Sequence, residues 1–389
     1  MQYTVKITLQ SPTLVGDRRE PSAYFLPSRD YIPGGVLRAA LARVIKDDCP
    51  YEADEGLINW VEFVGGSECT RCSWCFLCSS FAELRFHNLY LDGARVAPLS
   101  AYRCKFNDDH PVFDTLLFSE RLSCPECKKP AERAGGYLKD GCKVEAKRRL
   151  IMRLEVDPYR GVAQDRQLYS LRVLREGQVF SGLLTVPDPA GAFPAELELR
   201  IGAKTTAGLG KARVHFEKAV GCGVEKLKER IVRFQEKARE LLDIPAGTKE
   251  GEFLYLSFTM LADALPEKRL TPKSERVSND TLQRELIEAL LPAGSPVSER
   301  LDGLVKVLAD FKVYGGYRTA ERGDGRRQAS LHISAGSVFL CRVRGPLDDE
   351  LLQSLLILEE RGLGMNKEDG YGAVRICDEI HLNKGRREV

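Results

Sequence analysis

Cysteines are the residues of this chain whose spacing most directly indicates chemistry, because eight of the twelve fall between residues 69 and 142. Crowding of this kind favours metal binding over disulfide formation. Cys104, His110, Cys124 and Cys127 offer three thiolates and an imidazole, a donor set that suits tetrahedral zinc. In an alternative set, Cys104 and His110 are incidental and Cys142 completes the site.

A second group of cysteines, Cys69, Cys72, Cys75 and Cys78, recurs at every third residue. The run is similar to that of cluster-binding ferredoxins, but it lacks their proline and their distant ligand. We therefore expect a second zinc here, with an iron–sulfur cluster as the less favoured alternative. Four protein ligands leave no open coordination position for water, so we expect one or two structural sites and no catalytic metal.

A glycine pattern occurs twice, at residues 201–214 and 363–376, with matched positions offset by 162 residues (364 minus 202). A shorter match precedes each copy, at residues 177–180 and 336–339. A duplicated domain explains both matches. The repeated positions are Gly202, Gly208, Gly210, Arg213 and Val214 in the first copy and Gly364, Gly370, Gly372, Arg375 and Ile376 in the second.

Such glycines bring backbone N–H groups close to phosphate, since they tolerate positive φ and carry no side chain. Here the glycines precede a strand and not a helix, which excludes the dinucleotide and phosphate-loop motifs. The alternative is a tight turn that closes a sheet. Basic residues flank both copies and favour contact with an RNA backbone. They are Lys204, Lys211 and Arg213 in the first copy and Lys367 and Arg375 in the second.

The elements that position these residues are mixed strands and helices, which indicates an α+β fold. We predict strands at residues 2–10, 169–173, 178–186, 252–260 and 337–343, and helices at 36–46, 224–242, 279–291, 299–311 and 347–360. The length of 389 residues fits about two domains. We assign residues 1–220 to the first, with a zinc-binding insertion at about 69–142, residues 221–250 to a charged, solvated connector helix or subunit contact, and 251–389 to the second.

The overall charge gives no strong field, since 58 basic residues oppose 56 acidic ones. Any nucleic-acid surface must therefore be local. No apolar run is long enough to span a bilayer, and the N-terminus alternates like a strand and not like a signal peptide. We expect a cytoplasmic protein with no membrane partner.

Residues 32–41, Ile-Pro-Gly-Gly-Val-Leu-Arg-Ala-Ala-Leu, resemble the motif that opens the first helix of RAMP proteins, the RNA-binding subunits of CRISPR effector complexes. The glycine loops resemble the C-terminal signature of that superfamily. Ala39 departs from the motif, which usually has glycine there. In order, the matches resemble the two-module RAMP subunit of type III-D systems. Further matching residues are 84–86 with 88–90, 98–100 with 104–105, 113–114, 124–127, 168–170 with 177–180, and 336–339.

The resemblance implies two tandem ferredoxin-like, RRM-related domains that bind the 5′ handle of a CRISPR guide RNA (crRNA). It also implies neighbouring RAMP subunits, a large polymerase-like subunit and indirect contact with target RNA. The loop between Tyr314 and Arg327 combines aromatic rings with arginines, which suits stacking on single-stranded RNA or a solvated loop. The candidate RNA contacts are Arg38, Lys204, Gly208, Gly210, Lys211, Arg213, Tyr317, Arg318, Arg326, Arg327, Lys367, Gly370, Gly372 and Arg375.

Catalysis has less support, and we expect a non-catalytic scaffold. Asp17 lies where the target-cleaving subunits of the resembled complexes carry an acidic residue, and a carboxylate there would hold Mg²⁺. A solvated loop aspartate is the favoured interpretation. His215 and His332 are candidate general bases without a recognisable partner. An RNA-cleaving enzyme and an iron–sulfur protein are the alternatives.

Overall fold

A computed structural model of the chain describes residues 1–16, 25–51, 61–118, 122–156, 159–160, 163–187, 193–219, 223–242, 252–268, 279–317 and 326–382, with the backbone alone at 155–156, 163–168, 279–283, 316–317 and 326–327. The chain divides into two compact units. Unit 1 contains residues 1–93 and 145–219, and unit 2 contains 94–144, 220–318 and 324–389. The sequence places all of 69–142 in the first domain, whereas residues 94–144 belong to unit 2.

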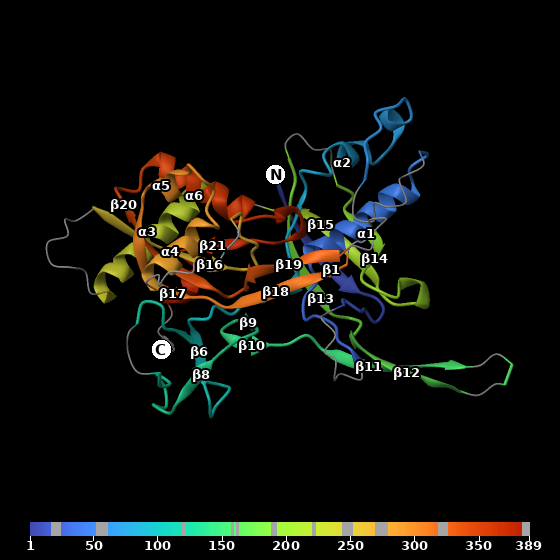
Figure 1. Ribbon diagram of the computed structural model, residues 1–389, viewed down its shortest axis with the longest axis horizontal. Helices are drawn as coiled ribbons and strands as arrows, with labels where there is room; N and C mark the ends of the chain where they lie inside the picture. The colour runs from blue at the N-terminus through green and yellow to red at the C-terminus, as the bar shows by residue number, and fades with distance from the viewer. Residues whose placement is uncertain are drawn as a thin grey trace. The chain divides into compact units, whose positions relative to one another are not determined.

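Unit 1 is built on an antiparallel sheet whose central strand is β1 (Gln2–Leu9) (Figure 1). Strand β13 (Val179–Thr185) pairs with one side of β1 and β15 (Lys211–Lys218) with the other. Outside them lie β14 (Glu196–Arg200), next to β15, and the short strands β3 (Arg85–Phe86) and β4 (Tyr90–Leu91), next to β13.

Period-two alternation buries Val5, Ile7 and Leu9 on one face of β1. The helix α1 (Gly34–Asp47) packs its apolar stripe, which includes Leu37 and Leu41, into the same core. The remaining elements of unit 1 are a hairpin of two long strands and short pieces around the cysteines and the first glycine loop. They are β2 (Phe25–Leu26), η1 (Cys69–Arg71), α2 (Cys75–Ser79), β11 (Arg148–Val156), β12 (Ala163–Leu174) and η2 (Thr205–Ala207).

Unit 2 has a four-stranded antiparallel sheet in the order β17-β20-β16-β21. Along the chain the elements run β16 (Phe253–Met260), α4 (Asn279–Glu288), β17 (Leu301–Leu308), β20 (Val338–Arg344), α6 (Asp349–Arg361) and β21 (Val374–Ile376). Helix α5 (Pro296–Glu299) precedes β17, and a hairpin of β18 (Phe311–Tyr317) and β19 (Arg326–Ile333) precedes β20. Unit 1 has the same order of its corresponding strands, with β15, β1, β13 and β3 adjacent.

The structure confirms the α+β class and corrects two details of unit 2. The predicted helix at 299–311 contains strand β17, because residues 301–308 pair antiparallel with β20, with irregularities near Gly303 and Val305. Helix α3 (Val224–Leu241) is not a solvated connector. Its residues Leu227, Ile231, Phe234 and Ala238 are fully buried in the core of unit 2, at helical spacing.

Residues 94–144 form small sheets within unit 2, and they contact the rest of that unit through apolar and polar side chains. Leu116 and Leu117 belong to the core of unit 2, and Lys306 Nζ donates to the carbonyl of Thr115 at 2.6 Å. None of the described helices is both long and apolar enough to cross a membrane. The remaining elements of unit 2 are β5 (Arg95–Val96), β6 (Ala101–Cys104), β7 (Phe113–Asp114), β8 (Ala131–Arg133), β9 (Tyr137–Lys139), β10 (Cys142–Val144), η3 (Lys367–Asp369) and η4 (Glu379–Leu382).

Candidate functional site

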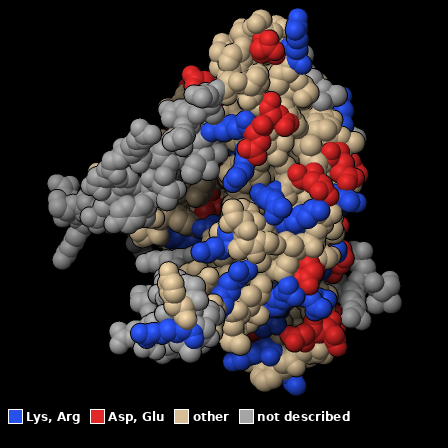
Figure 2. Space-filling view, turned by 90° about the vertical axis from the view of Figure 1, so that its right-hand side faces the viewer, with Lys and Arg blue, Asp and Glu red and all other residues tan. Residues whose placement is uncertain are grey.

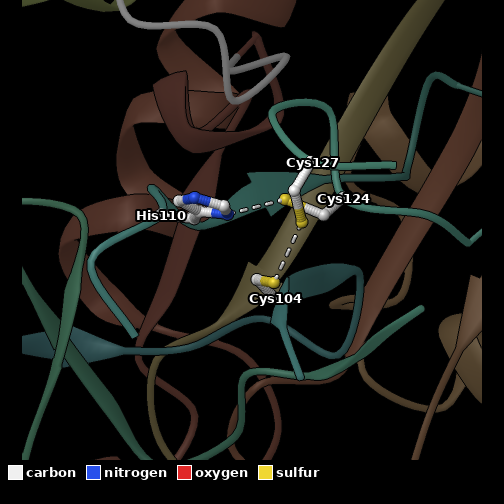
Figure 3. A group of neighbouring side chains, drawn as sticks. All are labelled: Cys104, His110, Cys124 and Cys127. Carbon is white, nitrogen blue, oxygen red and sulfur yellow. Dashed lines mark hydrogen bonds between the residues drawn. The ribbon is translucent and has the colours of Figure 1, made fainter. Parts of the chain in front are cut away.

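The four ligands predicted from spacing come together in unit 2, where their side chains point toward one another (Figure 3). His110 Nδ1 lies 3.2 Å from Cys124 Sγ, and Cys104 Sγ lies 3.6 Å from Cys127 Sγ. All four ligand atoms lie within 4.8 Å of one another. Zinc with Zn–S bonds of about 2.3 Å would set tetrahedral ligands about 3.8 Å apart, so the set fits zinc.

Local backbone geometry brings Cys124 and Cys127 close together and stabilises the thiolate of Cys104. Residues 124–127 form a tight turn in which the N–H of Lys128 donates to the carbonyl of Cys124 at 2.9 Å, and Lys128 takes positive φ. The backbone N–H of Phe106 donates to the sulfur of Cys104 and lowers the pKa of that thiol to about 7, although burial opposes the shift. Cys142 is exposed and is not part of this set among the described residues, which disfavours the alternative ligand.

A buried polar network links residues 94–144, which include the predicted zinc ligands, to the rest of unit 2. Asp114 Oδ1 lies 3.1 Å from His381 Nδ1, and His381 Nε2 lies 2.7 Å from Thr259 Oγ1. The Ser100 hydroxyl donates to the other oxygen of Asp114 at 2.5 Å. The order carboxylate, imidazole, hydroxyl is that of a catalytic triad, but no member is more than 1% exposed, so no substrate reaches it. Its role is structural, and no sequence pattern predicts it, because its members are far apart in the chain.

The first glycine loop, loop 1 (residues 201–210), is held by three backbone hydrogen bonds. Ile201 N–H donates to the Gly210 carbonyl, Ala203 N–H to Leu14 and Gly210 N–H to Pro12, at 2.8, 2.8 and 2.9 Å. The second, loop 2 (residues 363–372), repeats all three bonds. Leu363 N–H donates to Gly372, Met365 N–H to Leu265 and Gly372 N–H to Asp263, at 2.8, 2.8 and 2.9 Å.

Steric requirements account for most of the repeated glycines. Gly202, Gly210, Gly364 and Gly372 all have positive φ, and a Cβ at any of them would overlap a backbone carbonyl oxygen. The tight-turn interpretation therefore holds for these four positions. Gly208 differs, because it is exposed and a Cβ there would meet nothing within 4 Å.

Loop 1 offers an exposed segment with basic neighbours. Lys204 is exposed and has φ of 60°, a conformation that non-glycine residues seldom adopt. Arg200 Nη1 donates to the Thr205 carbonyl at 3.2 Å, and Arg153 Nη2 donates to the Ala207 carbonyl at 3.1 Å. Sequence analysis missed both arginines, since each reaches the loop from a strand.

Other candidate RNA contacts of unit 1 are paired or buried. Lys211 lies 3.3 Å from Glu198, and Arg213 lies 2.9 Å from Glu196, both across the β14–β15 pair. Arg38 is only 3% exposed, and its guanidinium lies over the Phe81 ring. On the face drawn in Figure 2, basic and acidic side chains lie next to one another, which agrees with the balanced charge of the chain.

Loop 2 has a different chemical surface. Lys367 is half-buried, and the two residues that follow it are acidic. Arg375 Nη1 donates to Glu359 at 2.7 Å, and Glu359 also pairs with the buried Arg230. Gly370 has φ of 93° and, like Gly372, is buried. Arg375, which follows loop 2 in β21 (Val374–Ile376), therefore supports the fold of unit 2.

The remaining predicted residues divide into placed and unplaced ones. Tyr317, Arg326 and Arg327 have strand backbone in β18 and β19, while Arg318 and Asp17 lie outside the described residues. His215 is exposed beside Glu196, at 3.6 Å, and His332 is 3% exposed and 3.0 Å from the Ser330 hydroxyl. The other four predicted ligands, Cys69, Cys72, Cys75 and Cys78, line one cavity of unit 1.

No protein-family model and no curated protein matches the chain. Among solved structures, a chain of the type III-B Cmr-beta complex bound to cognate target RNA and AMPPnP aligns with a TM-score of 0.40 and 11% identity, over 87% of this chain and 86% of that one. A chain of Cmr-beta in the apo state gives 0.32 and 11%, over 56% and 98%. A chain of a type IV-B CRISPR complex gives 0.30 and 11%, over 57% and 93%. Similarity at this level does not assign the chain to a family.

Proposed function

We propose that this chain is an RNA-binding structural subunit of a type III, III-D-like CRISPR effector ribonucleoprotein, and that it holds the 5′ handle of the crRNA. The observation that carries the proposal is the exposed segment of loop 1, with Lys204 in a left-handed conformation and Arg200 and Arg153 on its carbonyls. Guanidinium and ammonium groups around an exposed backbone turn suit phosphate contacts. The ordered motif matches along the sequence support the choice of complex.

Both units are proposed to be ferredoxin-like RAMP modules. In support, unit 2 runs strand, helix, two strands, helix, strand, with the first strand between the third and the fourth. In unit 1 the corresponding strands have the same order, and the second helix is replaced by β14 and η2. The partners in this proposal are crRNA, neighbouring RAMP subunits and a large polymerase-like subunit, with target RNA contacted indirectly.

The test is to purify the chain with its associated subunits from a host that makes guide RNA and to sequence the RNA that accompanies it. We expect RNAs that share one 5′ handle. The variant Lys204→Ala combined with Arg200→Ala should lose most of that RNA, and Lys6→Ala, which removes an exposed lysine of β1 paired with Glu217, should not. Absence of RNA, or a random population, would refute the binding role.

The proposed role includes no chemical step on RNA. Incubation of the purified complex with precursor and target RNA should give no cleavage that depends on this chain. Cleavage that Asp17→Ala abolishes while RNA binding persists would establish the enzyme alternative instead.

A further inference from the structure

A small cavity of unit 1, at the end of α1, is lined by five cysteines and not by four. Cys49 lies just beyond that helix, twenty residues before the cysteine run, and faces the same cavity as Cys69, Cys72, Cys75 and Cys78. Metal-ligand spacing in the sequence did not include it. Cys49 follows α1, whereas the other four cysteines lie in and around η1 and α2, so Cys49 comes from a separate element.

A contact that needs no metal holds Cys49 at this place. The carboxylate of Asp48, the residue that ends α1, accepts a hydrogen bond from the indole Nε1 of Trp74 at 2.8 Å. Trp74 lies inside the cysteine run and is only 8% exposed. The end of α1 is therefore fixed against the run by a buried aromatic anchor.

The cavity brings soft donor atoms together and holds one of them by the backbone. Its lining includes the side chains of five cysteines. The N–H of Trp74 donates to Cys72 Sγ at 3.4 Å, a bond that a metal-bound thiolate also accepts. Thiolate ligands select soft metals.

We propose that four of these five cysteines form a second metal centre, for zinc or for an iron–sulfur cluster, and that Cys49, just after the end of α1, is one of the ligands. Either group takes four thiolates, so one of the five remains outside the coordination shell. Cys78 is the candidate for that place, since its thiol donates to the Glu62 carbonyl at 3.4 Å, which a metal-bound thiolate could not do. The centre would cross-link α1 to α2, two elements that no disulfide joins among the described residues.

The first experiment measures metal and thiol reactivity in the full wild-type chain. We expect metal at two sites by elemental analysis: one zinc equivalent at Cys104, His110, Cys124 and Cys127, and at the new centre either one further zinc or the two to four irons of a cluster, as roughly expected for four thiolates. Mass spectrometry after iodoacetamide treatment should find Cys49 protected until a chelator removes the metal, whereas the exposed Cys142 reacts at once. A single equivalent, or immediate alkylation of Cys49 in the metal-loaded chain, would overturn the proposal.

Variants then identify the ligand. Cys49→Ser should weaken the second site by more than the roughly 10–100-fold that loss of an outer-shell partner costs, and Cys49→His should restore it in part because imidazole also binds zinc. Cys142→Ser is the matched control and should keep both equivalents. Full retention in Cys49→Ser would exclude Cys49 as a ligand. Iron with inorganic sulfide, and a visible absorbance band, would identify a cluster in place of zinc.

Discussion

The two glycine loops have the same backbone and opposite chemistry. Corresponding residues of loops 1 and 2 make the same three backbone hydrogen bonds, and Lys204 and Asn366 both adopt positive φ. Over residues 204–207 loop 1 has one lysine and no acid, whereas over residues 366–369 loop 2 has one lysine and two acids. Loop 1 is exposed there and loop 2 is half-buried.

The comparison shows that four of the repeated glycines meet a steric requirement of the fold that is common to both loops, whereas the residues between them differ in charge and exposure. A glycine that avoids overlap with a carbonyl oxygen is needed in both copies, whatever the loop contacts. Phosphate binding needs accessible positive charge, and Lys204 of loop 1 is exposed, whereas Lys367 of loop 2 is half-buried and is followed by two acidic residues. We therefore expect loop 1 to bind RNA and loop 2 to stabilise unit 2, and four measurements test that difference.

The largest effect should be equal in the two loops. Gly210→Ala and Gly372→Ala each place a Cβ against a carbonyl oxygen, of Ile201 or of Leu363, in a left-handed backbone. Each should lower the free energy of unfolding of its unit by about 4 kcal/mol in urea denaturation. The control Gly208→Ala, which meets open space, should cost only about 1 kcal/mol. A cost for Gly210→Ala no greater than for Gly208→Ala would show that the loop backbone adapts.

The second effect should separate the two arginines that follow the loops. Arg375→Ala removes a charged hydrogen bond to Glu359, whose side chain is 9% exposed, and should cost about 2 kcal/mol in thermal or urea unfolding. Arg213→Ala removes a surface pair with Glu196 and should change stability by at most about 0.5 kcal/mol. Equal costs would contradict a structural role restricted to loop 2.

The third effect is a pH dependence present only at loop 2. Burial alone would raise the pKa of Asp263, but Lys312, the Tyr314 hydroxyl and the Ala335 N–H outweigh it and hold that pKa below its usual value. Its stabilisation is therefore complete above about pH 4 and is lost as the pH falls through its folded pKa. The corresponding residue of loop 1, Pro12, does not titrate.

Asp263→Asn should therefore lower stability by about 1–2 kcal/mol at pH 7, and the difference from wild type should shrink below pH 4. Urea unfolding between pH 3 and pH 7 measures it. Lys312→Met, which removes the ammonium partner, should move the acid-induced loss to higher pH. An unchanged pH profile in both variants would exclude this role of Asp263.

The smallest effect concerns RNA affinity. Lys204→Ala should reduce the salt dependence of single-stranded RNA binding by about 0.7 in log–log slope, the value of one phosphate contact. Lys367→Ala should leave the slope unchanged. Titrations at several salt concentrations distinguish the two, and a larger loss for Lys367→Ala would reverse the assignment of the loops.

The sequence predicted well the features that depend on residues close together in the chain. Zinc-ligand spacing predicted the set around Cys124 and Cys127, and the structure brings those ligands together. Helical periodicity predicted α1, α4 and α6, with ends displaced by at most three residues. The glycine repeat predicted two equivalent loops, and their hydrogen bonds match.

Features that depend on pairing between distant elements could not be read from the sequence. Arg38 is basic and lies on an amphipathic helix, yet it turns inward onto Phe81. The sequence predicts RNA contacts for Lys211 and Arg213, but in the structure Glu198 and Glu196 of the paired strand β14 form ion pairs with them. The strand β17 carries mixed helical and strand signals, and pairing with β20 decides its state. No pattern of neighbouring residues predicts that Cys49 lines the cavity of the cysteine run, or that Asp114 and His381 form a buried pair.

The division of the chain has a consequence for its biosynthesis. Residues 94–144 leave the ribosome early, but His381 and Ile380, against which they pack, are among the last described residues to be made. Unit 1 likewise lacks β15 until residue 218 has been synthesised. Neither unit can complete its core as an uninterrupted segment of nascent chain, so folding must wait for contacts of very long sequence separation. A metal bound early by residues 104–127 would keep that segment ordered during the wait.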